Sequence, residues 1–458
     1  MNTEKLQLKS FLKKTMHDLL SVISGFVWGP FTLVLILGTG IFLSLGLKGF
    51  TFTYIFSAFR QIFKKNEASS EGEISSFQSL TTALSATVGT GNIAGVATAI
   101  YIGGPGAIFW MWISALVGMA TKYAEAFLAI KYREKNTQGE TVGGPMYYIK
   151  NGLSENYRIF AYLFAVAGMI AALGIGNGVQ VNSVSQVINN EFGISAFVIG
   201  LIISLLVALV ILGGIKSIGS ITSKLVPLMS AIYILGGLWI IILNAHEVSY
   251  IFNLIVTSAF TSTAATGGFA GATVWMALRY GVARGVFSNE AGLGSSPIAH
   301  AAANTNSPIK QGMISMLEPL IDTLIVCTIT AFVILMSNLW IGDINGAVLT
   351  ATSFESLMTN GKYIVILGLI LFSFSTIIGW SYYGEKCAEF LFGHKIIFYY
   401  RILWIIIIPI ASIIELNLMW LIADIMNGLM ALPNLIALIL LGPIIFIKTN
   451  ESKDSFKA

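Results

Sequence analysis

Residues 88–94 read Val-Gly-Thr-Gly-Asn-Ile-Ala, and residues 290–297 read Glu-Ala-Gly-Leu-Gly-Ser-Ser-Pro. Each stretch places a Gly-x-Gly among small and polar residues, inside a longer apolar run that should form a helix. Glycine disfavours a continued helix, and Pro297 lacks a backbone donor, so each run should unwind near its middle. The two stretches therefore predict a pair of interrupted helices.

The composition of the 458-residue chain predicts that these helices lie in a lipid bilayer. Hydrophobic residues make up 55% of the chain and charged residues only 10%, whereas a soluble domain has about a quarter of its residues charged. Apolar runs of about 20 residues span a bilayer as helices, because lipid cannot hydrogen-bond an exposed backbone. The net charge of +4 fits basic cytoplasmic loops, so no nucleic-acid partner is expected.

Hydropathy predicts eleven transmembrane helices, one leading helix followed by ten core helices. They are expected near residues 20–46, 78–101, 105–130, 157–188, 194–213, 223–243, 268–303, 311–336, 361–391, 395–415 and 418–447. The interrupted runs are then core helices 1 and 6, at corresponding places in two sets of five. Such pairs are typical of inverted-repeat transporters. The predicted fold is an all-α membrane protein with a 5+5 inverted-repeat core and broken helices 1 and 6.

The predicted repeats divide the chain into four parts. Residues 1–77 hold the N-terminal tail, the leading helix and a basic cytoplasmic segment, and residues 448–458 form a cytoplasmic tail. Residues 78–243 and 244–447 are the two five-helix repeats. The polar stretch near 131–156 is too short for a nucleotide-hydrolysing domain, and no phosphate-binding loop motif occurs. Uphill transport must therefore be driven by an ion gradient.

Basic residues predict the orientation in the cell inner (cytoplasmic) membrane. If residues 48–77 are cytoplasmic and the helices alternate, the outside loops after the leading helix hold only Lys362. The C-terminus is then cytoplasmic and the N-terminus outside. The N-terminal tail carries Lys5, Lys9, Lys13 and Lys14, so either it is an exception to the positive-inside rule or the leading helix does not fully span.

Other functional classes fit the residues poorly. Thr-Val-Gly-Thr-Gly at 87–91 looks like a potassium-channel filter, but a filter needs four copies around a pore and this chain has one. Glycines alone could form a helix-packing face, which leaves the polar residues at the same depth unexplained. The histidines are scattered, and neither H-E-x-x-H nor a nucleophile elbow occurs. We predict a transporter, not an enzyme, with no cofactor beyond its coupling ion.

The sequence also resembles the alanine or glycine:cation symporter family. The resemblance is carried by Val-Gly-Thr-Gly-Asn-Ile-Ala-Gly-Val-Ala-Thr-Ala-Ile (88–100), Gly-Gly-Pro-Met-Tyr-Tyr (143–148), Gly-Ile-Gly-Asn-Gly-Val-Gln (174–180), Gly-Val-Phe-Ser-Asn-Glu-Ala-Gly-Leu-Gly-Ser (285–295) and Phe-Ser-Thr-Ile-Ile-Gly-Trp-Ser-Tyr-Tyr-Gly-Glu (374–385). It covers nearly the whole chain and implies a fold like that of the bacterial leucine transporter. It further implies symport of sodium with alanine or glycine. Transport of glutamine or another larger neutral amino acid, and coupling to protons, stay as alternatives.

The resemblance implies a site between the two interrupted helices. The substrate's amino and carboxylate groups would be held by Gly89, Thr90, Gly91, Asn92, Ile93, Phe287 and Ser288. Its side chain would be lined by Gln180, Thr376 and Trp380. Sodium, the only metal expected, would bind the carbonyls of Ser85, Val88 and Phe372 and the hydroxyls of Ser375 and Thr376. A weaker second sodium site would use Thr87, Asn92 and Ser288.

Ionisable residues at membrane depth are costly and are therefore functional candidates. Glu290 should either cap freed amides of the neighbouring break or contact the substrate's amine. Arg284 and Asp424 would pair as an outer gate, or else snorkel or cap helices. Glu318 and Asp322, one helical turn apart, would pair with nearby helix ends or form part of a cation path. The oligomeric state does not follow from the sequence.

Overall fold

The computed structural model describes residues 2–64, 71–261, 274–414 and 416–452. These residues are almost entirely helical, apart from one antiparallel hairpin, β1 (Glu134–Lys135) and β2 (Thr141–Val142). Seven of the described helical segments are long and apolar enough to cross a membrane, so the chain is a multi-pass membrane protein. Three shorter apolar helices, Ala94–Gly103, Ala196–Ile211 and Ile396–Ala411, accompany them. The count of eleven spans stays a prediction.

The predicted leading helix consists of two helices. They are α1 (Asn2–Val27) and α2 (Pro30–Gly46), followed by the short helices α3 (Phe50–Thr53) and α4 (Ile55–Phe63). Gly29 interrupts the helix, and Pro30 opens α2 at the first-turn position where a missing N–H costs nothing. The Trp28 Nε1 donates to the Asp424 carbonyl at 2.9 Å and so ties this segment to the C-terminal helix.

The first half of the core contains the first predicted break. Its helices are α5 (Ser76–Thr87), η1 (Thr90–Asn92), α6 (Ala94–Gly103), α7 (Gly106–Lys131), α8 (Pro145–Gly152), η2 (Glu155–Tyr157), α9 (Arg158–Ala171), η3 (Ala172–Val179), α10 (Gln180–Phe192), α11 (Ala196–Ile211) and α12 (Gly214–Leu243). Residues 88–93, called the first break below, leave α-helical geometry between α5 and α6. The interruption predicted for core helix 1 is confirmed.

The second half contains the other break. Its helices are η4 (Ala245–Glu247), α13 (Val248–Ser258), α14 (Val274–Asn289), α15 (Ser296–Ala301), α16 (Pro308–Ser315), α17 (Leu317–Pro319), η5 (Leu320–Cys327), α18 (Thr328–Met336), η6 (Leu339–Ile341), α19 (Gly346–Leu357), α20 (Lys362–Phe392), α21 (Ile396–Ala411) and α22 (Leu416–Ser452). Residues 290–295, the second break, separate α14 from α15, as predicted. The first residues expected for core helix 6, 268–273, lie outside the described residues.

Two helices expected from hydropathy are confirmed as continuous spans, Glu155–Phe192 and Pro308–Met336, but neither is α-helical throughout. Core helix 3, predicted as one helix over 157–188, contains the π-helical segment η3, and the predicted core helix 7 contains a second one, η5. A Cβ added to Gly176 of η3 would lie 2.1 Å from the Trp380 Cβ, so the glycines there let α20 approach closely. The helices α13 and α19 were not predicted, because their runs are too short to stand out as membrane spans.

The two broken helices run in opposite directions. Ile74, just before α5, forms a β-bridge with Ala303, just after α15, so the start of one broken helix lies beside the end of the other. At mid-length the first break touches the end of α14, since a Cβ on Gly91 would lie 3.2 Å from the Phe287 ring. This antiparallel crossing is the arrangement expected of inverted repeats.

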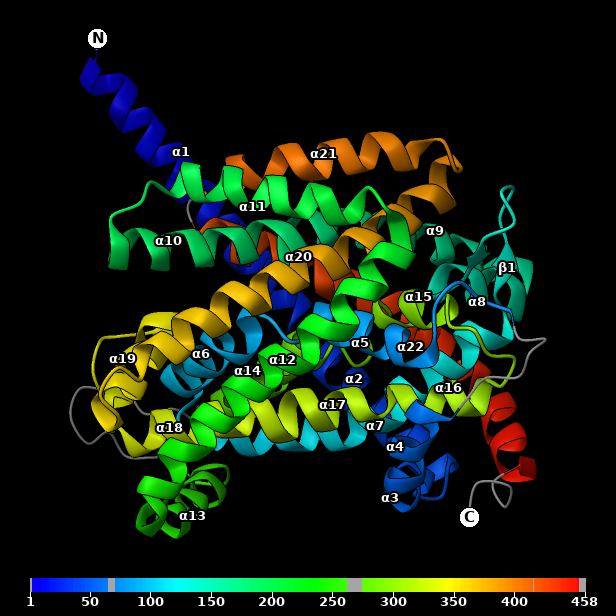
Figure 1. The fold of residues 1–458 in the computed structure, drawn as a ribbon, viewed down its shortest axis with the longest axis horizontal. Helices are drawn as coiled ribbons and strands as arrows, with labels where there is room; N and C mark the ends of the chain where they lie inside the picture. Colours follow the sequence, from blue (N-terminus) through cyan, green and yellow to red (C-terminus); the bar gives the residue numbers. More distant parts are fainter. Residues whose placement is uncertain (1, 65–70, 262–273, 415, 453–458) are drawn as a thin grey trace.

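The remaining helices enclose the crossing. Figure 1 shows α10, α11 and α21 together along one side, α7 and α16–α18 along the other, and α12 and α20 running diagonally across the view. Contacts between α11 and α21 and between α7 and α16 confirm these pairings. The start of α1 and the end of α22 lie at opposite ends of the molecule (Figure 1). Residues of both breaks are buried, so the crossing is an interior site.

Close packing at the start of α7 gives a testable consequence. A Cβ on Gly106 would lie 2.4 Å from the Ser258 carbonyl oxygen and 2.6 Å from the Ala259 nitrogen, both backbone atoms. We expect Gly106→Ala to lower the free energy of unfolding by about 1–3 kcal/mol, because the backbone must shift. Gly38→Ala is the matched control, since nothing lies within 4 Å of its added Cβ. Equal melting temperatures of the two purified variants would contradict the expected clash.

Candidate substrate and sodium site

The first break exposes backbone groups between three helices. The Gly89 amide donates to the Asn92 Oδ1 at 2.9 Å, and the Thr90 amide donates to the Gln180 Oε1 at 3.2 Å. A Cβ on Gly89 would lie 2.7 Å from the Thr376 Oγ1. Glycine is therefore required here, because the backbone approaches α20 too closely for any side chain. The structure thus brings the expected residues of core helices 1, 3 and 8 together.

The second break uses left-handed backbone. Glu290, Gly292 and Gly294 have φ values of 57°, 91° and 80°, a region that favours glycine. The Glu125 Oε1 accepts hydrogen bonds from the amides of both glycines, each at 3.1 Å. The Asn434 Nδ2 donates to the same carboxylate oxygen at 2.6 Å and to the Gly292 carbonyl at 2.9 Å. Side chains from α7 and α22 therefore satisfy the freed backbone of α14 and α15.

The amides of the neighbouring first break have partners other than Glu290, since Gly89 donates to Asn92 and Thr90 donates to Gln180. The amides of Gly292 and Gly294 are bonded to Glu125, on α7. Glu290 instead accepts hydrogen bonds from the Trp380 Nε1 at 2.9 Å and from the Ser295 hydroxyl. It thereby links the second break to α20. Glu125 could have been noticed in the sequence as an acidic residue inside the apolar run 105–130.

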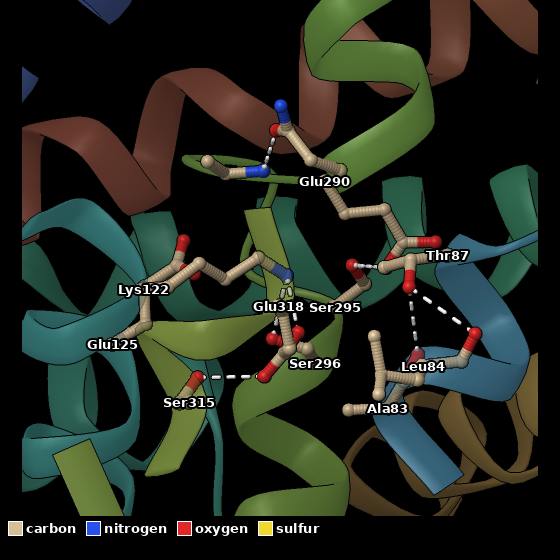
Figure 2. A network of polar contacts seen from close by, with 12 residues as sticks. Ala83, Leu84, Thr87, Lys122, Glu125, Glu290, Ser295, Ser296, Ser315 and Glu318 are labelled. Carbon is tan, nitrogen blue, oxygen red and sulfur yellow. Dashed lines mark hydrogen bonds and ion pairs between the residues drawn. The ribbon is translucent and has the colours of Figure 1, made fainter. Parts of the chain in front are cut away.

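Asp322, on η5, joins the two breaks. Its carboxylate accepts from the Asn92 Nδ2 of the first break at 2.6 Å and from the Ser288 hydroxyl, just before the second break, at 2.7 Å. The Thr323 hydroxyl donates to it at 2.8 Å. Two of the three residues of the expected second sodium site therefore surround a carboxylate. The Thr87 hydroxyl bonds the carbonyls of its own helix, at Ala83 and Leu84 (Figure 2).

A buried charge network lies on the α15 side of the second break. The Lys122 Nζ is 3.0 Å from the Glu318 Oε2 and donates to the Ser296 hydroxyl at 2.8 Å (Figure 2). The Glu318 Oε1 accepts from Ser315 at 2.7 Å and lies 2.5 Å from the His300 Nε2. The Lys122 and Glu318 side chains have no exposed surface. Their ion pair attaches the start of α15 to α7 and α17. Lys122 was not among the residues predicted from the sequence.

The expected sodium ligands lie together where α5 unwinds. The Ser375 hydroxyl is 3.3 Å from the Ser85 carbonyl oxygen and 2.8 Å from that of Phe372. The Thr376 hydroxyl is 3.3 Å from the Val88 carbonyl oxygen. The two buried hydroxyls of α20 therefore each face one carbonyl of the first broken helix, and the Ser375 hydroxyl also bonds the Phe372 carbonyl of its own helix. Such a neutral oxygen set suits a hard cation such as sodium, whereas the soft ligands of transition-metal sites do not contribute to it.

A cavity of about 520 Å³ reaches Ala94, the first residue after the first break. It is lined by residues of α1, α6, α10, α14, α19 and α22, among them Arg284 and Asp424. The Arg284 guanidinium donates to both carboxylate oxygens of Asp424, at 3.1 and 2.9 Å. It also lies over the Phe287 and Trp420 rings. The expected pair is therefore formed between the cavity, called the vestibule below, and the second break.

Trp380 is buried and does not face lipid. Its side chain packs on Gly176 of η3 and reaches Glu290 of the second break. Its ring also makes an edge contact with Tyr383, at 5.5 Å between centroids. The tryptophan therefore fills space between η3, α20 and the second break.

Two antiparallel broken helices, with converging backbone groups and a vestibule leading to them, define an inverted-repeat secondary transporter. The chain belongs to the sodium:alanine symporter family, whose sequence model matches residues 13–458. It is therefore a transporter and not an enzyme, and the predicted family is confirmed.

Relatives and solved structures agree with this class. The chain is 49% identical over 453 residues to the sodium/alanine symporter AgcS of Methanococcus maripaludis, covering 96% of this chain and 99% of the relative. It is 38% identical over 451 residues to the probable sodium/glutamine symporter GlnT of Bacillus subtilis, covering 98% and 93%. The fold is similar to that of the crystal structure of MhsT in complex with L-phenylalanine, with a TM-score of 0.57, 11% identity, and coverage of 83% and 99%. The predicted leucine-transporter-like fold is confirmed.

The role of Glu125 can be tested by stability. Glu125→Ala leaves the amides of Gly292 and Gly294 without an acceptor, and an unpaired buried donor costs about 1–3 kcal/mol. We expect a clear fall in the melting temperature of the purified protein in detergent. Glu125→Gln keeps one acceptor oxygen and should fall less. The control is Glu155→Ala, whose side chain is 82% exposed. If Glu125→Ala has the same melting temperature as the wild type, contacts other than those of Glu125 stabilise the second break.

Proposed function

We propose that the protein carries sodium and a small neutral amino acid, alanine or glycine, together into the cell by alternating access. The observation that carries the proposal is the oxygen cluster between α5 and α20. The Ser375 and Thr376 hydroxyls face the Ser85 and Val88 carbonyls at 3.3 Å. Carbonyls freed by an unwound helix can replace part of the hydration shell of a cation. No ionised side chain belongs to this cluster, which favours sodium over a proton.

The substrate would lie beside this cluster, between the two breaks. In this proposal the backbone of Gly89–Ile93 and of Phe287 and Ser288 binds the charged ends of the amino acid, because unwound helix ends expose amides for a carboxylate and carbonyls for an ammonium. Thr376 would contact both ligands, since its hydroxyl lies beside Val88 and Gly89. Shared contact of this kind would make each ligand bind better when the other is present.

Alanine is favoured over glutamine by two observations. Identity is higher to the sodium/alanine symporter than to the probable sodium/glutamine symporter, 49% against 38%. Trp380 also occupies the space between η3 and the second break and is held there by its hydrogen bond to Glu290. A long substrate side chain would have to displace it. Gln180, whose Oε1 accepts from the Thr90 amide, would line the same pocket.

Arg284 and Asp424 would form the outer gate. Their bidentate ion pair lies below the vestibule, and each side chain is 12% exposed, so opening it would connect the vestibule with the site. In this proposal the vestibule faces outside, the protein lies in the cell inner membrane, and the C-terminus is cytoplasmic. The positions of α1 and the end of α22 at opposite ends (Figure 1) support an outside N-terminus. The repeats would span 78–243 and 244–447, with the flanking parts 1–77 and 448–458 outside them.

Sodium coupling is tested by ion replacement in proteoliposomes. Uptake of labelled alanine should fall to the level of protein-free liposomes when choline replaces external sodium at fixed pH. A proton gradient imposed without sodium should not restore it, because the cluster offers no titrating group. Full uptake driven by that proton gradient would overturn sodium coupling and make Glu290 and Asp322 the first proton carriers to examine.

The ligand role of α20 is tested by removing one hydroxyl. A hydrogen bond to a charged group contributes about 1.5–3 kcal/mol, so Thr376→Ala should raise the sodium concentration for half-maximal uptake about tenfold to a hundredfold. Ser381→Ala is the matched control, because its buried hydroxyl, on the same helix, bonds the Ile378 carbonyl one turn away. If Thr376→Ala is as abundant as the wild type and transports normally, Thr376 contributes only packing and does not bind the ligands.

A further inference from the structure

Asn427, on α22, has a buried amide without any hydrogen-bond partner. Its side chain has no exposed surface, and neither the Oδ1 nor the Nδ2 reaches a polar atom of the described residues. Every other buried side-chain amide of the described residues has at least one paired atom. The Asn434 Nδ2 binds Glu125 and Gly292, the Asn182 Nδ2 binds the Ala411 and Ile414 carbonyls, and even Asn177 and Gln311, whose oxygens lack partners, donate through their nitrogens. Buried polar atoms in proteins nearly always have partners. An amide that is unpaired on both sides therefore points to a partner that is not part of the chain.

The helix register places Asn427 beside the candidate site. It follows Trp420, Ala423 and Asp424 by seven, four and three residues, so the four share one helical face. On that face Trp420 stacks on Phe287, at 4.8 Å between ring centroids, and Asp424 binds Arg284. Ala423 contacts η3, since a Cβ on Gly174 would lie 3.6 Å from its Cα.

The contacts of other α22 residues locate Asn427 along the helix. Trp420, Leu421 and Asp424 line the vestibule, and Asn434, two turns beyond Asn427, bonds Gly292 of the second break. Asn427 therefore lies past the Arg284–Asp424 pair and before Gly292, at the level where α14 ends. No sequence motif marked it, because a single asparagine in an apolar helix carries no pattern.

The donors and acceptor of the Asn427 amide restrict which ligand groups can hydrogen-bond to it. A carboxamide presents two donors and one acceptor side by side. The charged ends of an amino acid match it poorly, because a carboxylate only accepts and an ammonium only donates. In the proposed function the backbone of Gly89–Ile93 and of Phe287 and Ser288 binds these ends. A hydroxyl or a second carboxamide carries both a donor and an acceptor and can satisfy both sides of the Asn427 amide.

We propose that Asn427 is a specificity-determining residue of the substrate site and hydrogen-bonds the polar side-chain end of a bound neutral amino acid. The substrate class then includes an amino acid with a side-chain hydroxyl, as in serine, or a carboxamide, as in glutamine, besides alanine. This inference rests on the proposed function, because it requires an amino acid between the breaks. Trp380 would still limit length, so the hydroxyl of serine fits with less displacement than the carboxamide of glutamine.

The test is competition against sodium-driven uptake of labelled alanine in proteoliposomes. Unlabelled alanine, serine and glutamine are titrated against the wild type and Asn427→Leu, which keeps the side-chain volume but removes the amide. We expect serine, glutamine or both to compete in the wild type. Their inhibition constants should rise about tenfold in the variant, while that of alanine changes by less than about threefold. Loss of serine competition identifies the hydroxyl, and loss of glutamine competition the carboxamide.

The melting temperature of the variants distinguishes a specificity-determining role of Asn427 from a structural role. Asn427→Leu removes an unpaired amide, so the purified variant should melt at or above the wild-type temperature. Asn182→Leu is the matched control: it removes the hydrogen bonds that the Ala411, Ser412 and Ile414 carbonyls accept from the amide and should melt lower, with the order of competitors unchanged. Asn427→Ala serves as a second variant if the leucine is not accommodated, and it should show the same selective loss.

Two results would overturn the inference. In one, neither serine nor glutamine competes in the wild type; in the other, both Asn427 variants change all three inhibition constants by the same factor. Failure of the proposed function looks different, since the wild type would then take up no alanine with sodium. In that case the three amino acids are compared by the melting-temperature increase they cause in the purified wild type and Asn427→Leu. A serine or glutamine shift lost only in the variant would still support the inference.

Discussion

An unwound helix in the middle of a bilayer exposes amides and carbonyls that lipid cannot hydrogen-bond. The rest of this structure depends on satisfying those groups from within the protein. At the second break, the Glu125 carboxylate accepts from two glycine amides, and Asn434 bridges that carboxylate to a carbonyl of the same break. At the first break, Asn92 and Gln180 accept from the amides of Gly89 and Thr90. The broken helices are stable only because neighbouring helices bring these side chains to them.

The side chains that surround the breaks bring buried charge into the core and couple the two breaks to each other. Asp322 accepts hydrogen bonds from Asn92 and Ser288, and so a single carboxylate joins the first break to the end of α14. Lys122 pairs with Glu318 and holds Ser296 at the start of α15. Removing one member of a buried pair leaves an uncompensated charge, which is strongly destabilising. Both broken helices are therefore attached to η5, and α15 is also attached to α7 and α17. A change of access must move or rearrange these attachments.

The same geometry separates groups that are fully paired from groups that remain open to ligands. Asn434 and Asn182 have partners for both amide atoms within the chain and serve the scaffold. The amide of Asn427 and the hydroxyl of Thr90 lack them, although both residues are fully buried. The Glu125 carboxylate stands between these cases, because its Oε1 is paired and its Oε2 is not. A membrane interior makes unpaired polar groups costly, and the proposed substrate contact would remove that cost for Asn427. Only the contacts in the structure distinguish the two cases, because a paired asparagine and an unpaired one look the same in the sequence.

The sequence by itself determined the membrane class, the two interruptions and the pairing of helices 1 and 6, because these depend on composition and on glycine and proline placed inside apolar runs. The motifs at 88–100 and 285–295 also led to the family. Only the tertiary structure decided which side chains meet the breaks. Lys122 and Glu125 lie on α7, 174 residues before the Ser296 hydroxyl and 167 residues before the Gly292 amide that they bind. Hydropathy reports how apolar a helix is and not which face it turns inward. Neither the capping of the second break by Glu125 nor the π segments η3 and η5 could therefore be read from it. Those features arise from packing between distant helices, where buried polar groups select their partners by distance.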